Sequence, residues 1–250
     1  MGMFSRRSKG FTYYRRENRF RKRLSRFLVF LLLLYLVFQA VALIIVTPYR
    51  ITGSSMEPTI PAGGKSLAIP MVYGIQIPFT HRSIPGFGRP RRGDIVICTP
   101  PTHTEAPWYL RIADSVSSFF TLGKVRIAVD REQVWDSRLA VKRIIGIPGD
   151  TIRLETYEAS IRPEGKQSFF SEFDIIQKNY DTRIDPLPEN WLPEFPFSGT
   201  LGEITLGDNE YFLLGDNRTS SKDSSIWGPV DRGALRARIM VSYLPGFRLH

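Results

Sequence analysis

The longest apolar stretch of the chain covers residues 27–46, which read FLVFLLLLYLVFQAVALIIV. These 20 residues include no charged side chain, and Gln39 is the only strongly polar one. About 20 helical residues span the roughly 30 Å hydrocarbon core of a bilayer. The pattern therefore predicts a transmembrane helix over 27–46, between an N-terminal segment 1–26 and a large domain 47–250.

A cleaved signal peptide is the alternative interpretation of this stretch. Residues 40–42 read AVA, the A-x-A form of a cleavage site, and 27–38 would be its apolar core. Apolar residues continue over 43–46, however, where a cleavage site would be followed by a polar, accessible chain. This continuation favours an anchor that stays attached.

Beyond residue 46 the pattern changes to short apolar or alternating runs separated by Gly and Pro, which is typical of strands joined by turns. Such runs predict strands at 65–69, 94–99, 125–129, 140–147, 151–155, 210–214 and 236–243. The expected fold class is mainly β, with a barrel-like or sandwich-like domain over 47–250. The ranges 70–92, 100–124 and 156–207 are expected to be insertions or loops.

One inserted segment has helical periodicity. Over 108–122, large apolar residues recur near one face of a helix, with Pro107 at its start and Gly123 at its end. The sequence predicts a short amphipathic helix there. It leaves open whether this helix packs on the sheet or lies on a bilayer.

Charge is distributed very unevenly along the chain. Of 34 basic and 24 acidic residues, ten basic and one acidic fall within 1–26, so the rest is nearly neutral. By the positive-inside rule, this basic segment predicts a cytoplasmic N-terminus and a domain outside the cytoplasm. Nucleic-acid-binding proteins more often carry their positive charge on the folded domain, so we expect no nucleic-acid partner.

The sequence gives little support to metal or disulfide chemistry. The single cysteine, Cys98, lies in the apolar run 95–98 and is interpreted as a small buried residue of a strand. The three histidines lack metal-ligand spacing, and no glycine-rich nucleotide loop is present. We therefore expect neither a metal nor a cofactor.

Four short segments contain residue types found in catalytic sites. They read TGSSMEPT at 52–59, RGDIV at 92–96, VKRIIGIPGD at 141–150 and GDNRTSSKDS at 215–224. Each alone has an ordinary explanation, such as a Gly-Ser linker or a Pro-Gly turn. Together, in this order after one apolar span, they resemble the conserved boxes of bacterial type I signal peptidases, or leader peptidases, which are serine proteases with a Ser-Lys dyad. The resemblance extends over the whole of the large domain.

This resemblance implies a membrane-anchored endopeptidase in which Ser55 is the nucleophile and Lys142 the general base. A serine hydroxyl needs a base beside it, and no histidine lies in a motif that suits a Ser-His-Asp triad. A lysine can act as the base when desolvation lowers its pKa from about 10.4. Lys142 lies in the apolar stretch 139–147, where alternate side chains can face a core.

The resemblance also implies that Ser221 orients Lys142 and that Asp223 belongs to the supporting network. Some family members carry an arginine two residues after this acid, where the present chain has Ser225. The candidate partners of Asp223 are then Lys222 and Arg143.

The oxyanion of the reaction is expected to be held by backbone N–H groups, including that of Ser55. Some family members add a serine hydroxyl two residues before the nucleophile, where this chain has Gly53. Ser54 or a backbone N–H would have to compensate for the missing hydroxyl.

The family cuts signal peptides after small residues in an A-x-A pattern, using shallow apolar pockets. The expected pocket residues of this chain are Met56, Pro58, Ile95, Val96, Ile144 and Ile145. The expected partners are the signal peptides of exported preproteins and the lipid bilayer. The expected location is the inner (cytoplasmic) membrane, with one span and the catalytic domain outside the cytoplasm.

Two other functions fit parts of the pattern. A self-cleaving Ser-Lys repressor shares the dyad, but the apolar span and the segment around Lys142 argue against it. An inactive or specialised homologue that acts as a membrane-bound binding or assembly factor is the alternative from a different class.

Overall fold

The computed structural model describes residues 10–44, 47–76, 83–101, 109, 113, 116–117, 139–186, 190 and 198–250. The chain divides into two compact units, Met1–Ala42 and Leu43–His250. Each unit is described here by itself.

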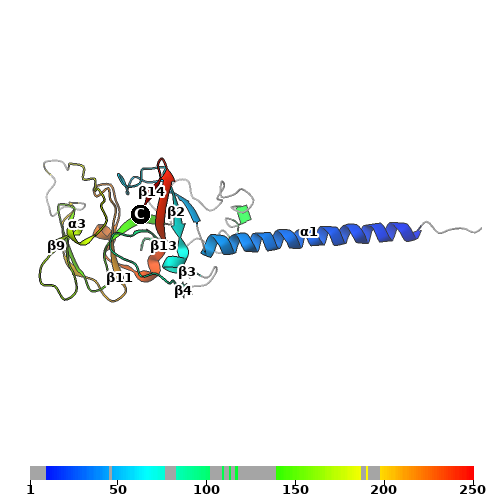
Figure 1. Cartoon of the computed structure of the whole chain (residues 1–250), viewed down its shortest axis with the longest axis horizontal. Coiled ribbons are helices and arrows are strands. Elements are labelled where there is room, and N and C mark those ends of the chain that lie inside the picture. Colours follow the sequence, from blue (N-terminus) through cyan, green and yellow to red (C-terminus); the bar gives the residue numbers. More distant parts are fainter. Residues whose placement is uncertain are drawn as a thin grey trace, which may run out of the picture. The chain divides into compact units, whose positions relative to one another are not determined.

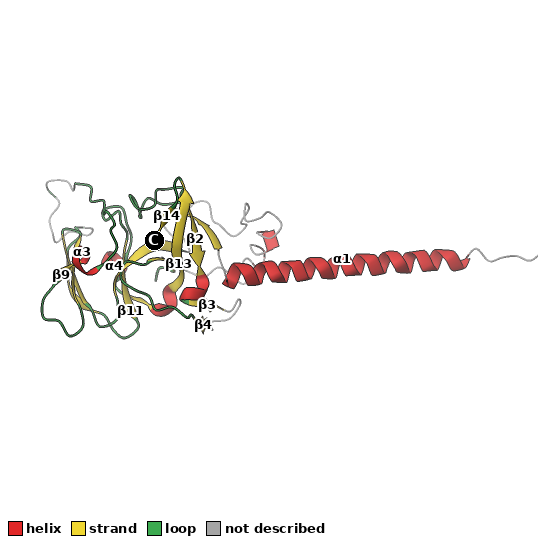
Figure 2. Cartoon of the chain, in the orientation of Figure 1, coloured by secondary structure: helices red, strands yellow, loops and turns green. Residues whose placement is uncertain are grey.

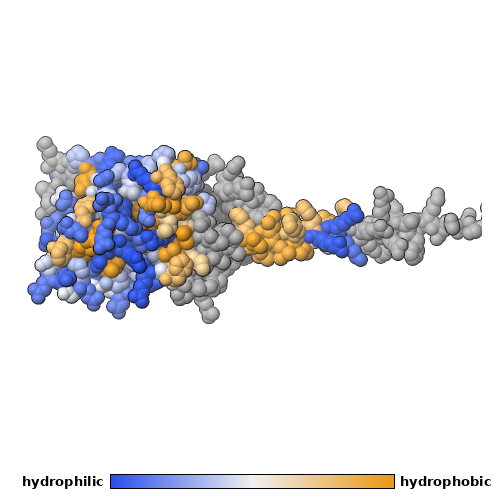
Figure 3. Space-filling model, viewed as in Figure 1, coloured by the Kyte–Doolittle hydropathy of each residue, from blue (hydrophilic) through white to orange (hydrophobic). Residues whose placement is uncertain are grey.

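The first unit is dominated by one long helix, α1, over Gly10–Ile44 (Figure 1). It extends further toward the N-terminus than the predicted apolar span. Its described side chains change from hydrophilic to hydrophobic along the helix (Figure 3), and apolar residues such as Phe30 are more than half exposed. Within the part of the chain that the structure describes, no helix is both long and apolar enough to cross a membrane. The transmembrane helix predicted at 27–46 is therefore not confirmed.

The second unit is built on an eight-stranded antiparallel sheet (Figure 2). Its strand order is β1-β2-β13-β5-β6-β11-β12, and β14 also pairs with β13. The strands are β1 Thr47–Arg50, β2 Lys65–Ile69, β5 Ile95–Cys98, β6 Ala140–Gly146, β11 Glu210–Leu214, β12 Val230–Asp231, β13 Leu235–Leu244 and β14 Arg248–Leu249. The mainly β fold expected from the sequence is confirmed.

A smaller four-stranded sheet packs against the large one. Its order is β10-β7-β8-β9, with β7 Thr151–Glu155, β8 Glu158–Arg162, β9 Phe170–Ser171 and β10 Leu201–Thr205. The two sheets share a core, because Ile152 and Ile161 of the small sheet cluster with Ile145 and Phe212 of the large one. The stretch 156–207 thus supplies three strands as well as loops.

The remaining elements are short. They are the hairpin of β3 Gly74–Gln76 and β4 Ser83–Pro85, the helices α3 Glu172–Ile175 and α4 Ser224–Trp227, and the 3-10 helices η1 Pro70–Val72 and η2 Arg232–Ala234.

The local pattern predicted most strands of the central sheet. The strands expected at 65–69, 151–155 and 210–214 are confirmed with these bounds, and those at 94–99, 140–147 and 236–243 are confirmed to within one residue at each end. The strand expected at 125–129 lies outside the described residues, and so does most of the helix expected at 108–122.

Candidate active site

Ser55 lies in a turn that follows β1 and is fixed by the core beneath it. Met56 and Ile60 are fully buried in one cluster with Ile95, and the Ile60 N–H donates to the Met56 carbonyl at 2.8 Å. Ser55 itself is half-buried. The buried neighbours hold this turn in place, while the serine remains near the surface.

Lys142 lies in the middle of β6 and is only 3% exposed. It pairs with Val96 of β5, and Cys98 is its diagonal neighbour on the same face of the sheet. Burial lowers the pKa of Lys142, and the nearby groups Asp223, Cys98 and Asp216 oppose this effect only in part. The burial expected for this lysine is confirmed.

The backbone of Ser55 meets the start of the fourth box at Gly215. A Cβ on Gly215 would lie 2.5 Å from the Ser55 carbonyl oxygen and closer still to Ser221 Oγ, so a side chain there would displace both. Leu214 pairs with Arg143, so the same register continued by one residue places Gly215 beside Lys142. Both members of the expected dyad therefore approach this glycine, although no hydrogen bond of the described residues joins Ser55 Oγ to Lys142 Nζ.

Asp223 is satisfied by uncharged donors. It is 1% exposed and accepts hydrogen bonds from the Gly215 N–H at 2.9 Å and from Ser221 Oγ at 2.5 Å. Its other oxygen accepts from Ser225, through the N–H at 3.1 Å and the hydroxyl at 2.8 Å. Ser225 thus occupies the place expected for a cation, and Ser221 is held by the acid.

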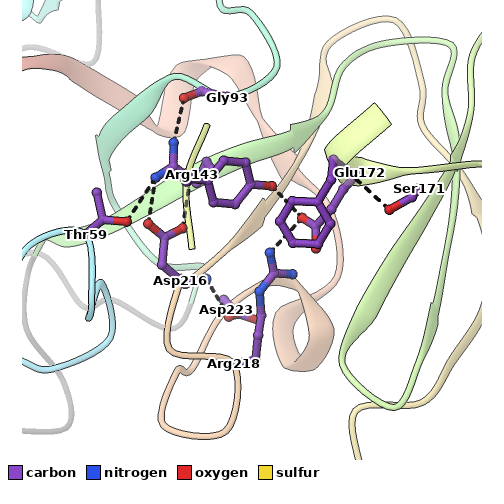
Figure 4. Close-up of polar contacts among 11 residues, drawn as sticks. Thr59, Gly93, Arg143, Ser171, Glu172, Asp216, Arg218 and Asp223 are labelled. Carbon is purple, nitrogen blue, oxygen red and sulfur yellow. Dashed lines mark hydrogen bonds and ion pairs between the residues drawn. The ribbon is translucent and has the colours of Figure 1, made fainter. Parts of the chain in front are cut away.

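Arg143 ties together all four boxes (Figure 4). Its guanidinium donates to Asp216 at 2.8 and 2.6 Å, to the Gly93 carbonyl at 3.0 Å and to Thr59 Oγ1 at 3.4 Å. The ring of Tyr180 lies 3.9 Å from the guanidinium carbon. Arg143 therefore pairs with Asp216 and not with Asp223, and among the described ion pairs none joins Lys222 to Asp223. Neither of the two candidate cations pairs with Asp223 among the described residues.

The acids of the second and third boxes hold structure. Asp94 is buried and accepts hydrogen bonds or ion pairs from three side chains of other segments, Tyr73, Lys178 and Arg238. Asp150 accepts two bonds from Arg92, at 2.8 and 2.5 Å. These contacts explain the Arg-Gly-Asp and Pro-Gly-Asp sequences as anchors of the turns.

The groups considered for the oxyanion lie at the edge of the site. Gly53 is exposed, and a Cβ there would meet open space. Ser54 Oγ lies 3.5 Å from Ser220 Oγ, which belongs to the fourth box. Among the described residues, no hydrogen bond joins Gly53 or Ser54 to Lys142.

The expected pocket residues are distributed over the core. Met56 and Ile95 lie in one hydrophobic cluster, Val96 and Ile144 in a second, and Ile145 in a third. All five are 0% exposed, whereas Pro58 is exposed. Contact of these side chains with a substrate stays a prediction.

A second buried ion pair, Glu172 with Arg218, could hardly be predicted from the sequence. Glu172 accepts from Arg218 Nη2 at 2.6 Å and from Tyr180 Oη at 2.8 Å. Burial and the charge of Glu172 raise the pKa of Tyr180, so its hydroxyl stays a donor. Only Arg218 lies inside one of the four boxes; Glu172 and Tyr180 belong to no motif.

The chain is similar in sequence to known proteins. The family model described as "Signal peptidase, peptidase S26" matches residues 23–244. Similar relatives include "Signal peptidase I" of Pseudomonas aeruginosa, 24% identical over 73% of this chain and 56% of that protein. "Probable signal peptidase I-2" of Synechocystis sp. is 27% identical over 78% of this chain and 62% of that protein. The chain thus spans less than two thirds of the length of these relatives. Since the family match covers most of its residues, the chain belongs to the signal peptidase family, peptidase S26.

Proposed function

We propose that this protein is a serine endopeptidase that removes signal peptides from exported preproteins, with Ser55 as nucleophile and Lys142 as general base. The observation that carries the proposal is the buried Lys142, whose pKa is lowered by desolvation, next to the Gly215 junction that Ser55 also contacts. A lysine that loses its proton in a protein core suits the activation of a serine hydroxyl.

The reaction then proceeds by acyl transfer. Neutral Lys142 takes the proton of Ser55 Oγ as this oxygen attacks the scissile carbonyl carbon. The protonated lysine gives its proton to the leaving amine, so the peptide C–N bond breaks and an ester to Ser55 remains. Water then attacks the ester while Lys142 takes its proton. Lys142 passes this proton to Ser55 Oγ as the ester C–O bond breaks, which releases the signal peptide and restores the serine hydroxyl.

The surrounding groups support this mechanism. Because Ser221 Oγ donates to Asp223, its lone pairs are left to accept a hydrogen bond from Lys142. Ser221 would in this way orient the amine toward Ser55. The oxyanion is assigned to backbone N–H groups, including that of Ser55, since Gly53 offers no hydroxyl.

Substrate and location follow from the family and from the N-terminal sequence. The relatives are named signal peptidases, which suggests preproteins cut after small residues of an A-x-A pattern as substrates. The uncharged stretch 27–46 and the basic segment 1–26 suggest a single-pass anchor in the inner membrane, with a cytoplasmic N-terminus. The exposed apolar side chains of α1 support a lipid environment.

The test is cleavage of a preprotein by the detergent-solubilised full chain. Ser55→Ala and Lys142→Ala should each lower kcat by at least about 10⁴-fold, as removal of a nucleophile or its base does in other serine proteases. Ser160→Ala in β8 and the exposed Lys166→Ala are matched controls that should cleave like the parent.

Two results would change the assignment. If both variants cut as well as the parent, the dyad is wrong. If the parent binds the preprotein without cutting it, the chain is an inactive homologue that acts as a binding factor.

A further inference from the structure

We propose that Glu172 is a positioning residue for the nucleophile, although it touches neither substrate nor Lys142. Figure 4 shows Glu172 beside Arg218 and the pair of Arg143 with Asp216. Through Arg218 and Tyr180, Glu172 holds both ends of the segment 216–218, and the central amide of this segment donates to the Ser55 carbonyl. This inference rests on the proposed function, because it assigns Glu172 a part in the same reaction. Glu172 is the first residue of α3, directly after strand β9 of the small sheet.

The first connection is a buried ion pair. Glu172 Oε2 and Arg218 Nη2 are 2.6 Å apart, and each side chain is 2% exposed. Within the described part of the chain, Nε and Nη1 of Arg218 have no hydrogen-bond partner, so Glu172 is the group that fixes this guanidinium. A buried charge that loses its partner is strongly disfavoured, so the pair acts as a rigid link.

The second connection passes through Tyr180. Its hydroxyl donates to the same Glu172 oxygen at 2.8 Å, and its ring stacks on the guanidinium of Arg143. Arg143 in turn holds Asp216 with two hydrogen bonds. Glu172 therefore supports the Asp216 end of the segment as well as the Arg218 end.

The nucleophile depends on the residue between these two ends. The Asn217 N–H donates to the Ser55 carbonyl at 3.0 Å. On its other edge the segment pairs with Arg183, which accepts from the Arg218 N–H at 2.8 Å and donates to the Asp216 carbonyl at 2.8 Å. A displacement of about 1 Å in such a support costs on the order of 10²-fold in rate, because attack requires close alignment.

Glu172→Gln tests this inference, since it removes the charge and keeps the shape. The measurement is single-turnover cleavage of a preprotein with the full-length enzyme in excess, because the saturated rate does not depend on the folded fraction. We expect a rate about 10- to 100-fold below the parent, with half-saturation unchanged within about twofold. Glu203→Gln, in the exposed pair with Arg162 on the small sheet, is the matched control and should stay within twofold.

A second variant covers the case in which Glu172→Gln does not fold. Tyr180→Phe removes one hydrogen bond to Glu172 and keeps the ring on Arg143. We expect a rate loss of about threefold, and a smaller additional loss when Tyr180→Phe is added to Glu172→Gln, since both changes weaken the contact between positions 172 and 180. Amide exchange at Asn217 should be faster in both variants, whatever their activity.

The outcomes separate the two proposals. If the parent cuts the preprotein and the Ser55→Ala variant fails to cut it, the proposed function is supported, but the role of Glu172 still depends on its own variant. The positioning role alone is then overturned by either of two results for a folded Glu172→Gln variant. Its saturated rate equals that of the parent, or only its half-saturation concentration differs. A parent that does not cut overturns both.

Discussion

At the scale of single residues, the burial of Lys142 conflicts with the charge that its amine carries when protonated. Lys142 lies among apolar side chains of the central sheet, where a protonated amine is costly. The charge of Asp223 favours a protonated amine and so opposes the effect of burial, while its oxygens accept hydrogen bonds from Ser221, Ser225 and Gly215. The lowered pKa of Lys142 is therefore obtained at the expense of stability.

This conflict predicts a pH-dependent gain of stability in Lys142→Met. The lowered pKa means that the unfolded parent binds one more proton than the folded parent between the folded pKa and about 10.4. The free energy of unfolding of the parent then rises with pH by about 1.4 kcal/mol per unit in this window. The variant lacks this dependence, so its advantage should be largest below the folded pKa and shrink as pH rises.

Urea unfolding of parent and variant at several pH values measures this difference. Lys166→Met, at an exposed position, is the control and should show no such trend. A constant difference between Lys142→Met and the parent across neutral to alkaline pH would show that Lys142 keeps its ordinary pKa.

At the scale of elements, β6 is the strand on which the site depends. Its successive residues face different parts of the core, with Val141 in one hydrophobic cluster, Ile144 in a second and Ile145 in a third. Between them Lys142 enters the site and Arg143 connects the loops of the other boxes. One strand thus carries both the proposed base, Lys142, and the frame that holds the turn of Ser55.

The buried pair of this frame predicts a large effect for Asp216→Asn. The change leaves the Arg143 guanidinium without its carboxylate at a site that is almost fully buried. Removal of one partner from such a pair costs about 3–5 kcal/mol, whereas an exposed pair contributes about 1 kcal/mol or less. Chemical unfolding should show this loss for Asp216→Asn but not for Glu203→Gln, which breaks the exposed pair with Arg162. Equal stabilities of the two variants would mean that Asp216 does not compensate Arg143.

The sequence predicted the elements whose signals are local. The alternation around Lys142 and the apolar run 95–98 gave their strands directly. β1 was missed because it is a four-residue edge strand that contains Pro48, which weakens a strand prediction. The partnership of Glu172 with Arg218 joins positions 46 residues apart, and no periodicity or motif marks it. Such pairs follow from tertiary packing alone.

At the scale of the whole molecule, the two units differ in how far their apolar side chains are exposed. The second unit buries its core residues in three clusters, one of which lies between its large and small sheets. α1 instead leaves large side chains such as Phe27 and Leu33 more than half exposed. A helix that is apolar on all sides needs another phase or another protein around it. If 27–46 is the proposed membrane anchor, the surrounding bilayer supplies that environment.

The anchor predicts a topology that depends on the basic residues before it. Four of them, Arg21, Lys22, Arg23 and Arg26, lie within six residues of the apolar span. Since basic residues near a span are retained in the cytoplasm, changing these four to Glu should leave the protein in the membrane but move residues 47–250 to the cytoplasmic side in part of the molecules. The parent should resist alkaline extraction from membranes and expose its C-terminal domain to protease only from outside the cytoplasm.

The control for this prediction is a set of four exposed basic residues of the second unit, Arg50, Lys65, Arg89 and Arg91. Their replacement by Glu should not change the orientation of the protein in the membrane. Release of the parent by alkaline extraction would show that α1 is not a membrane anchor, and the exposed apolar residues would then require a protein partner.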